Sequence, residues 1–214
     1  MGLKICLIYT GNCRTWELCN ENHKEVFGVK GWPVEERNFY VYFYTYERPI
    51  KCPILNECKE FTFNKIPESF YPDPYAVYKY NSRMRPENTP NQSRNQWLNN
   101  FVGFRLVPKG YDVYVRVRPD IKFSTQTIEW DKFDYSGNNI YIPKGNDYGE
   151  RSINDQFAFG NYEVMKAYYS VFLNYDELWE SGVTWHTEGM LYENLLKENI
   201  NIVRIPHPEE QVQR

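Results

Sequence analysis

Residues 111–120 read YDVYVRVRPD, and this stretch decides the predicted fold. Alternate residues of an extended chain share a face, so the three valines form an apolar side while Arg116 and Arg118 lie on the other. Pro119 cannot donate a ladder hydrogen bond, so it ends the strand and leaves Asp120 just beyond the carboxyl end. In open α/β sheets, ligands bind outside the carboxyl ends of the strands. We therefore expect a binding site at Asp120.

The sequence around this stretch alternates between strand and helix patterns. Strands are predicted at residues 3–9, 39–46, 60–63, 139–143 and 200–205. Helices are predicted at about residues 15–27, 92–107, 161–180 and 187–198. The proline-rich stretch 64–91 lacks periodicity, and a connection of this length is typical of an active-site lid. We expect a single domain over residues 1–214, or the N-terminal part of a longer protein.

Composition and charge argue against several classes of protein. The net charge is -3, from 25 basic and 28 acidic residues, so the basic footprint of a nucleic-acid-binding protein is missing. The apolar runs are shorter than the roughly 20 residues that a membrane-spanning helix needs, so we expect no membrane insertion. Five cysteines without a C-x-x-C pair predict reduced thiols and a cytoplasmic location. The 19 tyrosines and 6 tryptophans offer flat faces for stacking on a base or a sugar, besides core packing.

The charged end of the 111–120 strand suits a phosphate-bearing ligand. The Asp120 carboxylate can coordinate a hard divalent cation such as Mg²⁺ or Mn²⁺. The guanidinium groups of Arg116 and Arg118 match phosphate or carboxylate oxygens. The competing interpretation is a ladder of ion pairs without a ligand. Exposed pairs contribute only about 0–1 kcal/mol to stability, so we favour a functional site.

Four segments in a fixed order carry a resemblance to a known family. They are YTGNCRTW at 9–16, R-x-R-P-D at 116–120, NDQFAFG at 154–160 and TEGMLYENLL at 187–196. Together they resemble nucleotide-sugar glycosyltransferases of the GT-A fold, and more narrowly a group found in bacterial surface-polysaccharide loci and in large DNA viruses of algae. The resemblance implies a GT-A-like α/β fold, with a mixed, mostly parallel central sheet and helices on both faces.

The same resemblance implies an activity. The expected reaction moves a sugar from a UDP-sugar, either UDP-glucose or a UDP-deoxyhexose such as UDP-rhamnose, to a glycan acceptor. For a viral member, the acceptor would be a capsid glycan and the location the host cytoplasm. A single acid near the donor, Asp155, favours retention of the anomeric configuration.

The resemblance also assigns a metal site, with one departure. The family's D-x-D motif binds the metal and the donor diphosphate, whereas this chain has Arg118-Pro119-Asp120 and keeps only the last acid. Asp120 is therefore carried over as a ligand of Mn²⁺ or Mg²⁺, with His207 or His186 as a candidate to complete the shell. In the alternative interpretation, Arg118 takes over part of the phosphate neutralisation and the enzyme depends less on metal.

Two acids are candidate catalytic residues. By resemblance, Asp155 faces the donor sugar and Glu188 acts on the acceptor as general base. The structural alternatives are a turn cap for Asp155 and a helix-dipole role for Glu188. The predicted nucleotide-sugar-binding residues are Thr10, Gly11, Arg14, Arg116, Arg118, Gln156 and Trp185.

Two other functions compete with glycosyl transfer. The wealth of tyrosine and tryptophan would equally suit a non-catalytic glycan-binding module, which would bind sugar without nucleotide. A metal-dependent phosphohydrolase needs several clustered acids or histidines, and the sequence offers too few. The transferase is the favoured interpretation.

Overall fold

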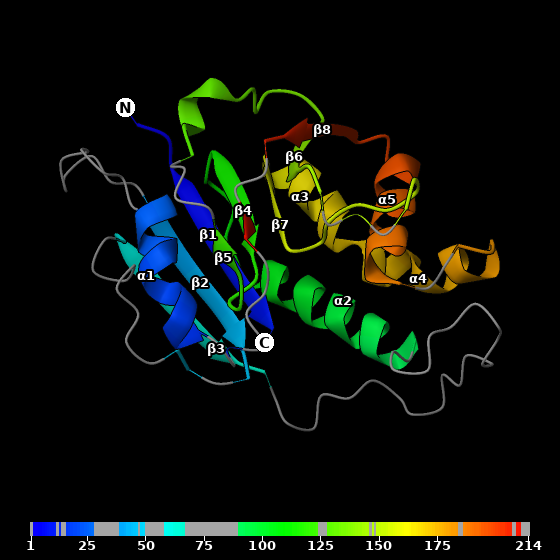
Figure 1. Cartoon of the computed structure of the whole chain (residues 1–214), viewed down its shortest axis with the longest axis horizontal. Helices are drawn as coiled ribbons and strands as arrows, with labels where there is room; N and C mark the ends of the chain where they lie inside the picture. Colours follow the sequence, from blue (N-terminus) through cyan, green and yellow to red (C-terminus); the bar gives the residue numbers. More distant parts are fainter. Residues whose placement is uncertain are drawn as a thin grey trace.

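The computed structural model describes residues 2–11, 13, 16–27, 39–46, 48–49, 58–66, 90–123, 128–145, 147, 149–183, 186–206 and 209–210. Its centre is a seven-stranded sheet in the order β3-β2-β1-β4-β7-β6-β8 (Figure 1). The strands are β1 (Ile5–Gly11), β2 (Phe39–Thr45), β3 (Glu60–Lys65), β4 (Val113–Val117), β6 (Asn139–Pro143), β7 (Phe157–Gly160) and β8 (Asn201–Ile205). Strand β7 is antiparallel to β4 and β6, and the other neighbouring pairs are parallel. The sheet is thus mixed and mostly parallel.

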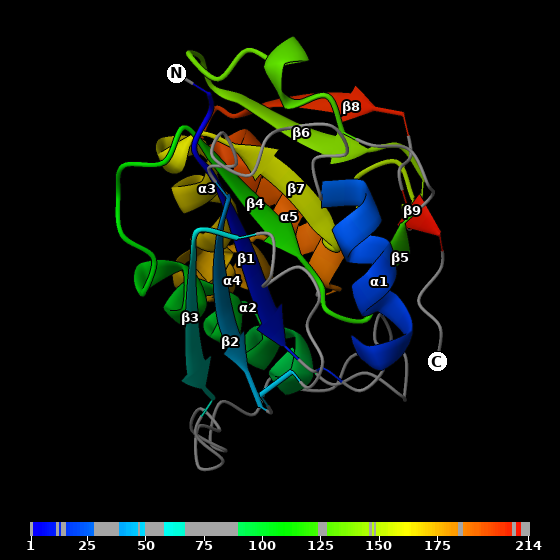
Figure 2. The ribbon, with the colours of Figure 1, turned by 90° about the vertical axis from the view of Figure 1, so that its left-hand side faces the viewer.

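Helices cover both faces of this sheet (Figure 2). One face packs against α1 (Trp16–Phe27), beside a two-stranded sheet of β5 (Lys122–Phe123) and β9 (Glu209–Glu210) and a 3-10 turn at Trp130–Lys132. The other face packs against α2 (Pro90–Arg105), α3 (Tyr162–Tyr169), α4 (Val171–Glu180) and α5 (Thr187–Lys197). Each face has its own apolar core, as expected for an α/β fold.

Strand β4 divides its side chains between these two cores. Val113, Val115 and Val117 pack in the core that contains α1, whereas Tyr114 packs in the core that contains α2 to α5. All five residues of the strand are buried, as the alternating pattern predicted. Arg116 shares its face with Tyr114, so its charged side chain lies on the helical side of the sheet.

The predicted helix over residues 161–180 is divided in two. Asn161 caps α3 as expected, because its side chain accepts from the Val164 N–H. The helix then breaks at Ser170, whose hydroxyl donates to the Ala167 carbonyl at 2.8 Å. The same carbonyl accepts from the Asn194 side chain at 2.8 Å. The Ser170 bond is local and the Asn194 bond comes from α5. Both occupy the Ala167 carbonyl in competition with the helical ladder, and they end α3 where the apolar periodicity continues.

The other differences concern short elements. Strand β7 (Phe157–Gly160) was not among the predicted strands, because so short an apolar run does not distinguish a strand from a turn. Of the stretch 64–91, residues 67–89 lie outside the described part of the chain, so the lid stays a prediction. Among the described residues, no helix combines the length and apolar character needed to cross a bilayer.

Candidate active site

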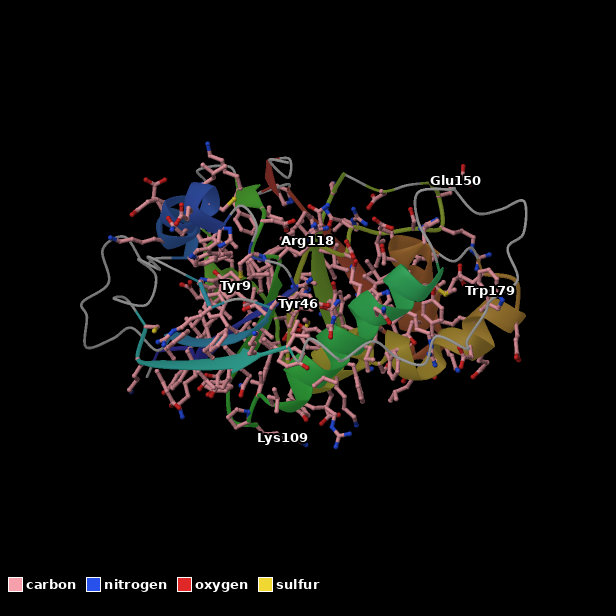
Figure 3. The ribbon with its side chains drawn as sticks, turned by 90° about the horizontal axis from the view of Figure 1, so that it is seen from below. Tyr9, Tyr46, Lys109, Arg118, Glu150 and Trp179 are labelled. Atoms are coloured by element: carbon pink, nitrogen blue, oxygen red, sulfur yellow. The ribbon has the colours of Figure 1, made fainter. Side chains whose placement is uncertain are left out.

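Three predicted segments meet at one edge of the sheet. Because β1 and β4 are parallel and β7 is antiparallel to β4, the carboxyl ends of β1 and β4 adjoin the amino end of β7. The Arg118 N–H donates to the Gln156 carbonyl at 3.1 Å, which joins two of the segments. Figure 3 shows Arg118 near the middle of the molecule when it is viewed from below. Thr10 and Gly11 at the end of β1 therefore lie at the same edge of the sheet as Arg118 and Gln156, and their roles as donor contacts stay a prediction.

Arg116 is a buried cation beneath this edge. Its side chain is almost fully enclosed, with 2% exposure. Nη1 donates to the Thr10 carbonyl at 3.3 Å and to the Val117 carbonyl at 2.7 Å. Its Nε–H has no hydrogen-bond partner among the described residues. Burying a guanidinium in the protein interior has a large free-energy cost, which is offset only when opposite charges lie close by.

Strand β1 ends on a glycine with an unusual backbone conformation. Gly11 has φ of 112°, in the left-handed region that glycine adopts without strain. The Thr10 hydroxyl is buried and donates to the Asn100 side chain on α2, so it anchors the strand to the helix. Arg14 and Trp185, two other predicted nucleotide-sugar contacts, lie outside the described residues.

Arg118 and Asp120 form a bidentate ion pair. Nε donates to Oδ1 at 3.0 Å and Nη2 donates to Oδ2 at 2.9 Å. Burial alone lowers the pKa of Arg118, but the carboxylates of Asp120, Asp155 and Glu188 outweigh burial and raise the pKa above its ordinary value. Arg118 is thus permanently charged, and three carboxylates act on it.

The described residues do not fit a divalent metal at Asp120. Both oxygens of this carboxylate already accept from Arg118. Within the described part of the chain, no three His, Cys, Asp or Glu side chains form a group that could hold a metal ion. The predicted second ligand, His207, lies outside the described residues, so its role stays a prediction. The alternative ligand His186 caps α5 through Nδ1, which accepts from the Gly189 N–H at 2.9 Å.

Asp155 is held inside the protein by α2 and α3. Its carboxylate accepts from the Gln96 side chain, and its backbone carbonyl accepts from the Tyr168 hydroxyl at 2.8 Å. Burial and the charge of Glu188 raise the pKa of Asp155 to about 6, although Arg118 and Arg116 oppose the rise. The turn-cap role considered for Asp155 falls instead to Asn154, whose side chain accepts from the Gln156 N–H at 2.8 Å.

Glu188 lies beside Asp155 in the first turn of α5. Its Oε2 accepts from the Thr187 hydroxyl at 2.8 Å and lies 3.4 Å from His186 Nδ1. Burial raises the pKa of Glu188, but the hydrogen bonds from His186 and Thr187 outweigh it, and the net pKa is lowered. The pKa values of the two neighbouring acids are therefore pushed apart, which is typical of carboxyl pairs with separate acid and base roles.

His186 Nδ1 can serve only one of its two neighbours at a time. It accepts from the Gly189 N–H when unprotonated, and it donates to Glu188 when it carries the proton. A Cβ on Gly189 would come within 2.9 Å of the imidazole Cε1, so glycine permits this close approach.

Sequence reasoning missed the contribution of α2. Gln96 and Asn100 lie four residues apart on one side of this helix, and they bond to Asp155 and Thr10 respectively. Between them, Asn99 donates to the Tyr46 hydroxyl at 3.0 Å. The sequence signal for this role is a set of amide side chains on one predicted helix. The same helix carries Trp97, which is fully buried in the fold.

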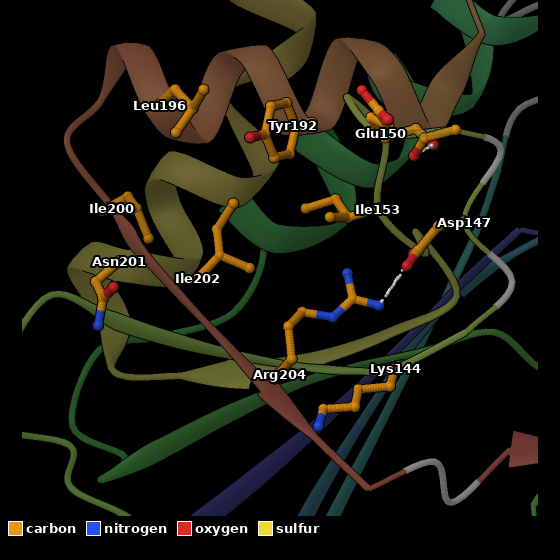
Figure 4. Close-up of a pocket in the computed structure, with 12 residues that line it drawn as sticks. Lys144, Asp147, Glu150, Ile153, Tyr192, Leu196, Ile200, Asn201, Ile202 and Arg204 are labelled. Carbon is orange, nitrogen blue, oxygen red and sulfur yellow. Dashed lines mark hydrogen bonds and ion pairs between the residues drawn. The ribbon is translucent and has the colours of Figure 1, made fainter.

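A cavity of about 660 Å³ lies between α5, β8 and the segment that follows β6 (Figure 4). Its lining is apolar at Ile153 and Ile202 and aromatic at Tyr192. The charged part of the lining includes Arg204, whose Nη2 lies 2.8 Å from Asp147 Oδ2. One lining residue, Ile153, bonds to the backbone of α5, because its N–H donates to the Glu188 carbonyl at 3.3 Å.

The comparisons with known proteins concern the fold. No protein-family model matches the sequence, and a search of curated proteins found no match. Among solved structures, mouse xyloside xylosyltransferase 1 in its apo form superposes with a TM-score of 0.56, covering 96% of this chain and 85% of that chain, at 13% sequence identity. The predicted fold class, a GT-A-like α/β fold with a mixed, mostly parallel sheet, is confirmed. The narrower resemblance to the R-x-R-P-D group stays a prediction.

Proposed function

We propose that the chain is a glycosyltransferase that moves a sugar from a UDP-sugar to a glycan acceptor. The observation that carries the proposal is the strand-end site, where Arg118 faces two carboxyl groups of divergent pKa. The fold likeness to a xylosyltransferase supports this class of reaction. The donors UDP-glucose and UDP-rhamnose come from the family resemblance, and the cytoplasmic location comes from the cysteine content. Both are part of the proposal.

The two arginines act on the leaving group. Negative charge grows on the diphosphate as its bond to the anomeric carbon breaks, and a preorganised cation stabilises that charge. Opposite unit charges about 4 Å apart attract by about 4 kcal/mol at an effective dielectric near 20. Arg118 is 26% exposed and can contact the donor, whereas Arg116 is buried and acts through its charge.

The two acids take different roles because their side chains differ in solvent exposure. The Glu188 side chain is 14% exposed and ionised, so it can accept the proton of an acceptor hydroxyl. Asp155 is buried, and its negative charge stabilises the positive charge that develops on the donor sugar. A base at Glu188 supports direct displacement with inversion. The sequence favoured retention, with Asp155 as a single acid near the donor, and NMR of the product distinguishes the two outcomes.

Ligand-dependent stability separates this proposal from a glycan-binding module. UDP at about 100 times its Kd is expected to raise the free energy of unfolding by about 2.7 kcal/mol, which corresponds to about 5–10 °C in Tm for a chain of this size. Free oligosaccharide alone is expected to have little effect. The measurement is a thermal-shift titration with UDP, uridine and an oligosaccharide panel. Stabilisation by oligosaccharide and not by UDP would favour the binding module.

The cavity lined by Tyr192 is the proposed acceptor site, because it offers an aromatic face and polar groups, and Tyr192 follows Glu188 by one turn of α5. Tyr192→Ala is expected to raise the KM for the acceptor by about tenfold, as expected from a loss of about 1.4 kcal/mol of binding. Tyr192→Phe keeps the ring and serves as the matched control. Initial rates would be measured while acceptor and donor are varied in turn. An unchanged acceptor KM, or an equal change in the donor KM, would contradict this placement.

A further inference from the structure

We propose that Arg118, held in place by Asp120, is the resident cation for the donor diphosphate and occupies the position where the resemblance predicts a divalent metal ion. The inference rests on the proposed function. It follows from the geometry of the ion pair, from the charges around it and from the chemistry of the leaving group.

The geometry leaves one edge of the guanidinium available to a ligand. A guanidinium has five N–H donors in a fixed plane. Asp120 takes the Nε–H and one Nη2–H, at 3.0 and 2.9 Å. Nη1 has no partner among the described residues, and the side chain is 26% exposed. Asp120 is therefore a positioning residue that fixes the plane, and the remaining N–H groups form a fork that matches phosphate oxygens.

The surrounding charges are those of a cation site. Asp120, Asp155 and Glu188 all act on the Arg118 guanidinium. A divalent ion at Asp120 would have to share both carboxylate oxygens with Arg118, and it would then lie against the charge of this guanidinium. The amino acid that departs from the D-x-D pattern is thus the one that supplies a permanent positive charge.

The reaction balances without a further reactant. The bond between the anomeric carbon and the diphosphate oxygen breaks, and its electron pair stays on UDP. The acceptor oxygen forms the new glycosidic bond, and its proton passes to Glu188. Hydrogen bonds from Arg118 stabilise the oxyanion of the departing UDP, as electrostatic catalysis requires.

Arg118→Asp tests the proposal, because it removes the cation and creates the D-x-D pattern. For the wild-type chain, calorimetric titration with UDP is expected to give the same Kd, within about twofold, in EDTA and in Mn²⁺. For Arg118→Asp, the Kd in EDTA is expected to rise by about 100-fold, and Mn²⁺ is expected to recover at least about tenfold, consistent with loss of a charged bidentate contact. Electron paramagnetic resonance of free Mn²⁺ measures metal binding directly, independently of activity.

Two further variants complete the experiment. Arg118→Lys keeps the charge but loses the planar fork, and its UDP Kd is expected to rise by about tenfold without any response to Mn²⁺. Lys166→Asp makes the same charge change on the exposed side of α3 and is expected to bind UDP like the wild type. If Arg118→Asp does not fold, the wild-type metal dependence and Arg118→Lys decide the matter.

Each contrary outcome has a separate meaning. Wild-type UDP binding that requires Mn²⁺ would overturn the proposal and leave the glycosyltransferase function intact. Failure of Mn²⁺ to bind or to recover a folded Arg118→Asp would overturn the claim that Arg118 occupies a metal position. Absence of UDP binding by the wild type in both buffers would instead contradict the proposed function.

Discussion

Glu188→Gln is expected to lower kcat by about 10²–10⁴-fold, the range typical of losing a general base. The KM for the UDP-sugar is expected to stay within a few-fold, because the substituted side chain faces the acceptor. Glutamine keeps the shape of the side chain and can still accept from the Thr187 hydroxyl, which bonds Glu188 at 2.8 Å. The substitution therefore removes the proton acceptor, and with it the charge that acts on Asp155, while the shape of the side chain is kept.

The matched control for this substitution is Glu180→Gln, at the exposed end of α4. Steady-state rates of UDP release with a saturating glycan acceptor provide the measurement. The control is expected to match the wild type. A kcat for Glu188→Gln within about threefold of the wild type would show that the carboxylate is not the base, and its helix-dipole role would then be sufficient.

Asp155→Asn is expected to stabilise the fold at pH 8 and to impair transfer. The pKa of Asp155 is raised to about 6 in the folded chain, against about 3.9 for an unperturbed aspartate. A raised pKa means that the folded state holds the proton more tightly than the unfolded state. The stability that this group contributes is therefore complete below about pH 4 and is lost as the pH rises through 6.

Asparagine is neutral, so the variant does not lose this stability as the pH rises. The variant is expected to gain about 1–3 kcal/mol in the free energy of unfolding at pH 8 over the wild type, and the gain is expected to shrink as the pH falls toward 5. Urea denaturation at both pH values measures it. Asp131→Asn, an exposed aspartate on the 3-10 turn, is expected to show no such dependence. A loss of stability at pH 8, or a gain independent of pH, would contradict the cause assigned to the pKa shift.

Part of the fold could be predicted from the sequence. Strands β4 and β6 could be predicted because each has a local apolar pattern, and β6 has the expected bounds, Asn139–Pro143. The division of the 161–180 helix at Ser170 could not be predicted from the sequence. It depends on Asn194, which is distant in sequence and bonds the Ala167 carbonyl only in the folded chain.

The same distinction applies to the site. Arg118 and Asp120 are two residues apart on a proline turn, so their proximity could be predicted, although their bidentate pairing could not. Asp155 and Glu188 were predicted by resemblance, but their mutual influence on pKa depends on the packing of α5 against the segment before β7. Gln96 was missed because the amides along α2 do not identify a partner until the folded chain brings α2 to Asp155.

Release of UDP from UDP-glucose and UDP-rhamnose in the presence of glycan acceptors tests the central claim most directly. The wild-type chain is expected to release UDP with at least one of these donors, to form a glycosylated product of inverted anomeric configuration by NMR, and to lose both with Glu188→Gln. A chain that binds oligosaccharide, fails to bind UDP and releases none from either donor would contradict the assignment and favour a glycan-binding module.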